Sequence, residues 1–275
     1  MNGAQGRGEI LELLARHGHH PNKRLGQHFL ADPNLVARIV SAAGVGSGDL
    51  VVEVGSGTGT LTRALAASGA DVIGFEIDRH LEPVLDEALR GTGVVVHFED
   101  ATAAALAAVI GDREAVVVAN LPYGVGTTLL LDLLQTVPGV SRLAVMVQRE
   151  VADRLAAPPG SRTYGLPSVV ASLRSEVSLL FRVPPTVFVP PPAVESAVVE
   201  LRRTHHDSAT SADLAAAERL AAVAFAGRRK MLRRSLAAVL DRPEEVLARA
   251  GIDPTARPES LAPWQFVDLA RAVDG

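Results

Sequence analysis

The sequence of 275 residues contains no cysteine. Its absence excludes a disulfide framework and thiolate catalysis, and it removes the commonest ligand of structural zinc sites. No apolar run reaches the roughly 18 residues that a membrane span needs, and residues 1–8 lack the apolar stretch of a signal peptide. We interpret His17, His19 and His20 as part of a polar loop. We therefore expect a cytoplasmic protein with no metal and no membrane anchor.

The chain also lacks an excess of positive charge, because it has 27 basic and 31 acidic residues and a net charge of -4. Nucleic-acid binders usually show a basic footprint, which the average charge does not provide. Some of the basic residues nevertheless cluster in two stretches that contain no carboxylate, Leu13–Ala31 and Arg219–Leu240. These candidates for RNA contacts are Lys23 and Arg24 in the first stretch, and Arg228, Arg229, Lys230, Arg233 and Arg234 in the second.

The second basic stretch has two interpretations, an RNA-binding surface and an ordinary solvated helix face. On an ideal helical wheel Leu232, Leu236 and Val239 share one side. Lys230 and Arg234 then point away from that side and are free to meet phosphates.

Residues 50–147 alternate short β-branched runs with alanine- and leucine-rich segments such as Leu61–Ala67 and Leu81–Leu89. This alternation predicts an α/β fold, a doubly wound parallel sheet with helices on both faces. Two later runs, Val177–Val183 and Ser196–Leu201, are expected to close the sheet. The five expected strands of the alternating part are Leu50–Val54, Asp71–Phe75, Val94–Phe98, Ala115–Ala119 and Leu143–Val147.

The polar stretch His205–Ser211 resembles a linker. Residues 212–275 contain only helix-like segments, interrupted by several prolines. We therefore predict a catalytic domain over residues 1–204 and a small all-helical, RNA-binding domain over residues 205–275.

A glycine-rich loop, Glu53–Gly59, follows the first expected strand and leads into a helix. A dinucleotide site requires G-x-G-x-x-G, but the position of its third glycine is held by Thr60. The loop matches instead the E/D-x-G-x-G-x-G pattern of class I methyltransferases, which bind S-adenosylmethionine. A plain strand-to-helix turn is the alternative.

Two acidic residues follow at the ends of the next strands. Glu76 ends the second expected strand, where a carboxylate can accept both ribose hydroxyls of a nucleoside. Asp100 follows the third strand, where it can accept from an adenine amine. Taken alone, each is also compatible with a solvated acid at a strand end.

The motif Asn120-Leu121-Pro122-Tyr123 comes directly after the fourth expected strand. The amine of adenine is a poor nucleophile because its lone pair is delocalised into the ring. Acceptors such as the Asn120 side-chain oxygen and a backbone carbonyl at the stiff Leu121-Pro122 step can orient it for methyl transfer. Tyr123 offers a face on which an extruded base can stack.

Seven ordered stretches resemble the KsgA/RsmA type of ribosomal RNA adenine dimethyltransferase, almost from end to end. Beside the glycine loop and the Asn120 motif they are Lys23–Leu30, Val147–Ala152, Phe188–Ser196, Arg228–Lys230 and Arg257–Leu261. The resemblance implies dimethylation of the N6 amine of two adjacent adenosines in the 3′-terminal hairpin of small-subunit ribosomal RNA, with a role in small-subunit biogenesis. We expect a monomer.

The same resemblance implies site residues. His28, Leu30, Gly55, Gly57, Glu76, Asp100 and Asn120 would line the pocket of S-adenosylmethionine, and Phe188 would close on the target base opposite Tyr123. Two positions depart from the family, which often carries Asn in place of His28 and of Gly124. The alternatives are an Erm-type methyltransferase of large-subunit RNA, which the Arg257–Leu261 segment and the helical tail disfavour, and a non-catalytic assembly factor, which the intact Asn120 motif disfavours.

Overall fold

The structure is a computed structural model of the chain, and it describes residues 4–122, 126–204 and 208–274, without the side chains of Lys23 and Asp274. The chain forms two compact units. The first contains Met1–Ala152 and Ser178–Arg202, and the second contains Asp153–Val177 and Arg203–Gly275. The sequence placed residues 153–177 in the first domain, whereas their contacts group them with the C-terminal helices.

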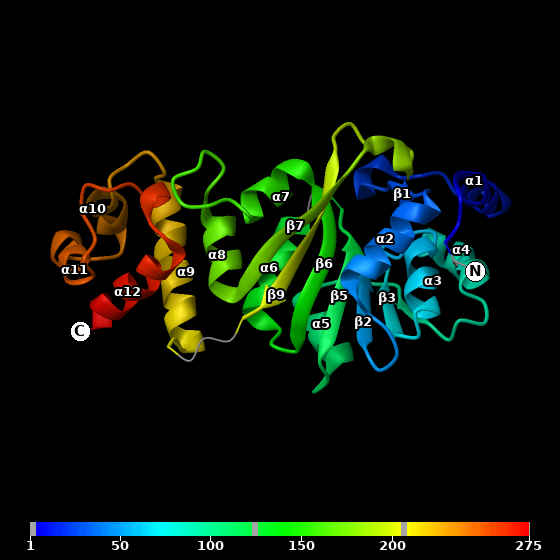
Figure 1. The fold of residues 1–275 in the computed structure, drawn as a ribbon, viewed down its shortest axis with the longest axis horizontal. Helices are drawn as coiled ribbons and strands as arrows, with labels where there is room; N and C mark the ends of the chain where they lie inside the picture. The colour runs from blue at the N-terminus through cyan, green and yellow to red at the C-terminus, as the bar shows by residue number, and fades with distance from the viewer. Residues whose placement is uncertain (1–3, 123–125, 205–207, 275) are drawn as a thin grey trace. The chain divides into compact units, whose positions relative to one another are not determined.

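The first unit is built on a seven-stranded sheet with the order β4-β3-β2-β5-β6-β9-β7 (Figure 1). The strands from β4 to β6 run parallel, and β9 is antiparallel to β6. The predicted α/β fold is confirmed. The strands are β2 (Leu50–Val54), β3 (Asp71–Phe75), β4 (Val95–His97), β5 (Ala115–Asn120), β6 (Val140–Gln148), β7 (Ser175–Val183) and β9 (Ser196–Arg203).

Helices connect the parallel strands, as the alternating pattern requires. They are α3 (Thr60–Ala67), α4 (Glu82–Ala88), α5 (Ala103–Ile110) and α6 (Gly126–Thr136), and a further helix, α2 (Pro33–Ala43), precedes β2. The limits of α2 follow from its sequence, because the Asp32 carboxylate caps the amides of Asn34 and Leu35, and Gly44 ends the helix in the left-handed conformation. The apolar face of α2 then packs with α3 and the central strands in one core.

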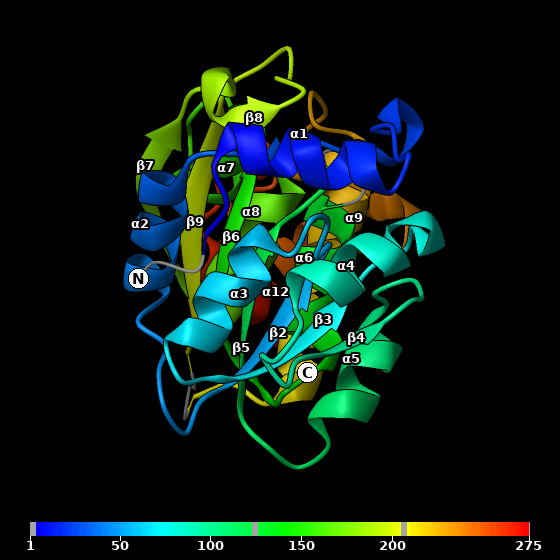
Figure 2. The same cartoon turned by 90° about the vertical axis from the view of Figure 1, so that its right-hand side faces the viewer.

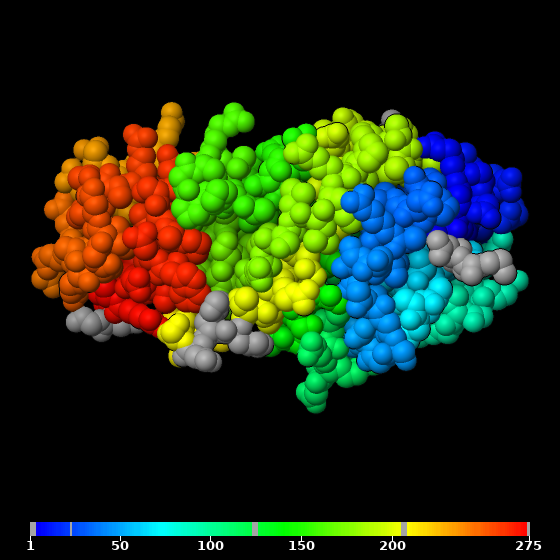
Figure 3. All heavy atoms as spheres, viewed as in Figure 1, coloured from blue at the N-terminus to red at the C-terminus, as the bar shows by residue number. Residues whose placement is uncertain are grey.

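An N-terminal segment that the sequence did not predict lies against these elements. It contains α1 (Arg7–Arg16), η1 (Lys23–Leu25) and β1 (Phe29–Leu30), and β1 pairs with β8 (Phe188–Val189). The Arg7 guanidinium donates to the carbonyls of Thr186 (2.8 Å) and Phe188 (3.0 Å). Figures 2 and 3 show α1 beside the β8 segment, which η3 (Pro185–Val187) precedes. A second short turn, η2 (Arg79–Leu81), follows β3.

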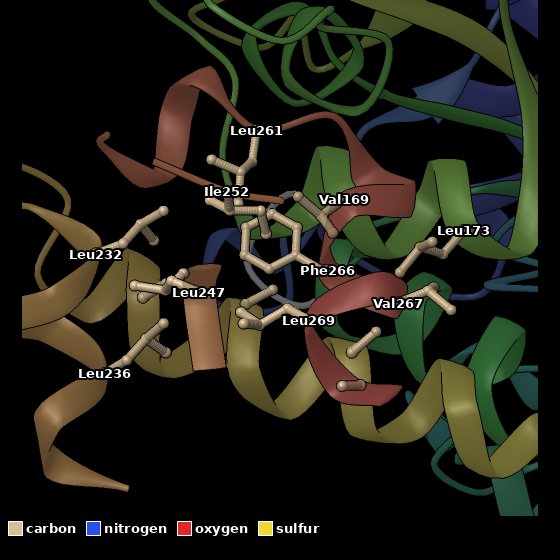
Figure 4. Close-up of a cluster of buried hydrophobic side chains, with 14 of the residues drawn as sticks. Val169, Leu173, Leu232, Leu236, Leu247, Ile252, Leu261, Phe266, Val267 and Leu269 are labelled. Atoms are coloured by element: carbon tan, nitrogen blue, oxygen red, sulfur yellow. The ribbon is translucent and has the colours of Figure 1, made fainter. Parts of the chain in front are cut away.

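The second unit is helical, and Figure 4 shows its core around the fully buried Phe266. Val169 and Leu173 belong to this core, which explains why the segment before β7 groups with the C-terminal helices. Arg174 and Glu218 form a buried two-pronged ion pair (2.7 and 3.1 Å). The elements are α8 (Leu166–Arg174), α9 (Ser211–Ala226), α10 (Leu232–Ser235), η4 (Leu236–Ala238), α11 (Pro243–Arg249), η5 (Pro258–Ser260) and α12 (Pro263–Asp274); α7 (Arg149–Leu155) precedes them at the unit boundary.

The helical wheel expected for the basic stretch was wrong. Lys230 lies in the turn between α9 and α10, and α10 itself has four residues. Leu232 and Leu236 are buried as predicted, but Val239 is 53% exposed. The helix gives way to η4 at Leu236, so the 3.6-residue period that the wheel assumed does not continue to Val239.

Candidate active site

A cavity of about 810 Å³ lies in the first unit, at the carboxyl ends of β2, β3 and β5. Ligands of open α/β sheets bind at these ends. The N-terminal segment and the start of α6 complete the wall. The predicted site residues that line the cavity are Arg24, His28, Leu30, Gly55, Gly57, Glu76, Asp100, Asn120, Leu121 and Pro122.

The glycine loop turns back on itself under the N-terminal segment. Gly55, Gly57 and Gly59 have φ of 80°, 57° and 77°, a region that residues with a side chain rarely adopt. A Cβ on Gly57 would lie 3.0 Å from a ring carbon of Phe29 in β1. Glycine is therefore required at this position both by the backbone and by the close approach of Phe29.

Glu76 connects the glycine loop to the end of β3. Its carboxylate is 6% exposed and accepts from the amides of Gly57 (2.8 Å) and Asp78 (2.9 Å). Burial raises the pKa of Glu76, although these two amide donors act in the opposite direction. A carboxylate has about four acceptor positions, so the group keeps acceptor capacity toward the cavity that it lines.

Asp78, two residues farther on, holds the N-terminal segment in place. It accepts from the Gln27 amide (2.7 Å) and from the His80 ring (2.9 Å). Burial acts to raise its pKa, but these donors outweigh burial and the pKa lies below its ordinary value. The ionised Asp78 therefore anchors the loop that carries His28 beside the cavity.

Asn120 occupies the end of β5, and its side-chain orientation is fixed. Its Nδ2 donates to the backbone carbonyl of His28 (3.1 Å). Because that carbonyl can only accept, the other end of the amide, Oδ1, is the acceptor that remains for the cavity. The Leu121 amide donates to the Met146 carbonyl (3.0 Å), which fixes the chain after Asn120 to β6.

His28, whose carbonyl accepts from Asn120, also contacts the proline-rich segment after β8. Its Nδ1 lies 2.7 Å from the carbonyl of Pro190 and must donate to it. Pro190 follows a cis peptide bond. The imidazole thus supplies a directed N–H to this carbonyl, and His28 lines the cavity.

The structure does not support a base-stacking role for Phe188. Its side chain is fully buried and packs in the core with Leu30 and Val183. An aromatic ring beneath a proline-rich loop gains more from burial than from exposure, and β8 pairs with β1 to hold it there. Tyr123, its expected partner, and the departure at Gly124 lie outside the described residues.

A buried polar group beneath the glycine loop was missed by the sequence analysis. Glu53 is 1% exposed and accepts from the Thr62 hydroxyl of α3. Burial raises its pKa to about 7, against the lowering effect of the Thr62 hydroxyl. A Cβ on Gly74 would lie 2.5 Å from Ser56 Oγ, so glycine in β3 makes room for this hydroxyl. The first position of the E-x-G-x-G-x-G motif was the available signal.

The basic residues of the second unit differ in their availability. Arg228 donates to Glu259 (3.1 Å) and to the Arg162 carbonyl (2.7 Å), and Arg233 donates to Glu244 (2.8 Å). Of the five residues predicted to contact RNA there, Arg229, Lys230 and Arg234 are exposed and make no such contact with the part of the chain that the structure describes. In the first unit Arg24 is exposed and lines the cavity, and the side chain of Lys23 lies outside the described set.

The described residues contain neither a candidate metal site nor a candidate membrane-spanning helix. They contain no group of three or more His, Asp or Glu side chains placed to hold a metal ion. Nor do they include a helix with the length and apolar character of a membrane span.

Solved structures share this fold. The dimethyladenosine transferase from Plasmodium falciparum superposes with a TM-score of 0.74 at 26% identity, over 88% of this chain and 96% of that one. The 23S rRNA methyltransferase ErmE gives a TM-score of 0.68 at 26% identity, over 90% of this chain and 100% of that one.

Curated relatives match over nearly the whole chain. Ribosomal RNA small subunit methyltransferase A of Paramagnetospirillum magneticum is 44% identical over 267 residues, 96% of this chain and 94% of the relative. The protein of the same name from Enterococcus faecalis is 39% identical over 276 residues, with coverage of 96% and 94%. The family model of the ribosomal RNA adenine dimethylases matches residues 18–274. This chain therefore belongs to the ribosomal RNA adenine dimethylase family.

Proposed function

We propose that this protein dimethylates the N6 amine of two adjacent adenosines in the 3′-terminal hairpin of small-subunit ribosomal RNA, with S-adenosylmethionine as methyl donor. The names of the curated relatives support the small subunit as the target. The observation that carries the proposal is Asn120, whose acceptor Oδ1 has no partner among the described residues and is fixed at the end of β5 on the wall of a cavity.

The cavity suits the proposed cofactor in its chemistry. Glu76 would accept the ribose hydroxyls, and Asp100 would accept from the adenine amine, because both line the wall at successive strand ends. The glycine loop and His28 would enclose the amino-acid part. S-adenosylmethionine would supply an electrophilic methyl group, and its sulfonium charge would be discharged as the methyl is transferred.

Asn120 would prepare the nucleophile. When an N–H of the adenine amine donates to Asn120 Oδ1 and the other donates to a backbone carbonyl at Leu121-Pro122, the nitrogen becomes tetrahedral and its lone pair is directed out of the ring conjugation. Little is required of a general base, because the amine proton can leave to water after the methyl group has arrived. Tyr123 would stack on the base.

The RNA would be held by the exposed cations of the two units. Arg229, Lys230 and Arg234 in the second unit and Arg24 beside the cavity are exposed, and each phosphate contact releases counterions and adds affinity. The acidic net charge of the chain requires that such contacts be local.

Nucleoside mass spectrometry of ribosomal RNA from a deletion strain tests the proposal. We expect N6,N6-dimethyladenosine to disappear from small-subunit RNA and to return with the wild-type gene. Complementation with Asn120→Ala is expected to fail. Loss of dimethyladenosine from large-subunit RNA instead would establish the Erm-type alternative.

A protein that acts only as an assembly factor is the second alternative. In that case Asn120→Ala would restore subunit maturation as well as the wild type, and the dimethylated nucleoside would be absent from both strains.

The cofactor assignment has a separate test. Glu76→Ala is expected to weaken S-adenosylmethionine binding by about 1.5 to 3 kcal/mol, the range for hydrogen bonds to a charged group. Calorimetry measures this directly, and an unchanged affinity in a folded variant would mean that Glu76 only braces the glycine loop.

A further inference from the structure

Glu53 is a buried carboxyl group that the proposed chemistry does not use. It lies in the middle of β2, between Gly74 of β3 and Val118 of β5, and it is 1% exposed. Both Glu53 and Ser56 belong to the residues that line the cavity. A carboxyl group is normally buried only when a cation or several donors compensate its charge.

Compensation for an ionised Glu53 is incomplete in the free protein. Thr62 donates to it from α3, and the strand neighbours opposite it are uncharged. Among the described residues no basic side chain forms an ion pair with Glu53, and the charged group that acts on it through space is Glu76, which is of the same sign. These surroundings favour the protonated form, in agreement with a pKa of about 7.

Ser56 provides a second and independent observation. Its hydroxyl oxygen is buried and has no hydrogen-bond partner in the described part of the chain. Buried hydroxyls without a partner are rare. Ser56 lines the same cavity as Glu53, so its hydroxyl is a donor that remains available to a carboxylate at this position.

We propose that Glu53 is a proton-linked positioning residue of the cofactor pocket, which loses its proton when S-adenosylmethionine binds. This inference rests on the proposed function. The cofactor carries a sulfonium, an ammonium and a carboxylate, and therefore a net positive charge. A cation in the cavity favours the ionised carboxylate: the O–H bond of Glu53 breaks, its electron pair stays on the carboxylate oxygen, and the proton passes to the buffer.

The linkage has a direction that can be measured. Because the bound state holds fewer protons than the free state, affinity for S-adenosylmethionine rises with pH up to about 7, by up to tenfold per pH unit, and levels off above it. At pH 6.5, binding is expected to release about half to three-quarters of a proton per cofactor.

The experiment is calorimetry of the full-length protein with S-adenosylmethionine at pH 6.5, in buffers of different ionisation enthalpy, which counts the released protons. Glu53→Gln keeps an acceptor for Thr62 and is expected to release almost none. Asp112→Asn is the control, because Asp112 is an exposed carboxylate that is not among the residues lining the cavity; it should release as many protons as the wild type.

Thr62→Val is the second variant, and it tests the proton linkage of Glu53 if Glu53→Gln does not fold. It removes the donor that favours the ionised carboxylate, so proton release should extend to higher pH than in the wild type. Cofactor binding without proton release, or equal release in wild type and Glu53→Gln, would overturn the inference while leaving the proposed function intact. Failure of the wild type to bind S-adenosylmethionine would refute the proposed function instead.

Discussion

The buried Glu53 also makes the stability of the free protein depend on pH. Its pKa is raised from 4.5 to about 7, so the folded chain binds this proton more tightly than the unfolded chain. Its contribution to stability is fully present below pH 4.5 and is lost as the pH rises through 7. A shift of this size corresponds to about 3 kcal/mol, with no discount for solvent because the group is 1% exposed.

The perturbation is Glu53→Gln, which stays neutral at every pH. At pH 5 the first unit of variant and wild type should be similarly stable, and at pH 8.5 the variant should be more stable by about 3 kcal/mol. The difference between the two proteins cancels the other titrating groups. Among these, Glu76 has a raised pKa and Asp78 a lowered one.

The assay must report on the first unit. The single tryptophan, Trp264, lies in α12 of the second unit, so its fluorescence during urea unfolding is the internal control and should not respond to the substitution. Hydrogen exchange of amides in β2 and β3 reads the opening of the first unit. A wild-type minus variant difference that stays constant from pH 5 to 8.5 would refute the reasoning.

Three further predictions concern chemistry, RNA affinity and the second core. Asn120→Ala should slow methyl transfer by roughly a hundredfold or more in single-turnover kinetics at saturating cofactor, while cofactor affinity falls less; a rate within a few fold would exclude its role as acceptor. Replacing Lys230 and Arg234 together with Gln should flatten the plot of log RNA affinity against log salt by about one to two units in filter binding, and an unaltered slope would place the RNA surface elsewhere. Arg174→Met should destabilise the second unit by about 3 to 5 kcal/mol in urea unfolding followed by Trp264 fluorescence, because it leaves the Glu218 charge buried without its partner. Additional replacement of Glu218 with Leu should recover most of that loss, and failure to do so would show that packing rather than charge is responsible.

The sequence predicted the central sheet closely because buried parallel strands are continuous apolar runs with clear limits. The run Leu50–Val54 is β2 without any change of boundary, and Asp71–Phe75 is β3. The two-residue strands β1 and β8 are too short to show a period, and their pairing joins segments far apart in the chain, so no local pattern could reveal them.

The candidate site was predicted where a motif marks a strand end. The motif after the fourth expected strand gave Asn120, and the position at the end of the second gave Glu76; the structure brings both to one cavity. The Ser56 hydroxyl without a partner among the described residues, and the space that Gly74 leaves for it, could not be predicted, because they arise from contact between the glycine loop and β3. The burial of Phe188 was equally inaccessible, since an aromatic residue in a proline-rich segment fits a core and a binding face alike.

The path of the chain through the two units has a consequence for synthesis. Residues 153–177 belong to the second unit although residues 178–202 return to the first. As the chain leaves the ribosome, α8 therefore emerges before α9 to α12. Until those helices are made, the side chains of Val169 and Leu173 remain exposed, because the core in which they are buried is not yet present. Domains usually fold as units in the order of synthesis, but here the first unit can add β9 to β6 before the helical unit is complete. A chain truncated after residue 204 would contain α8 but not the helices that cover its apolar side. Such a fragment should aggregate rather than behave as an isolated catalytic domain.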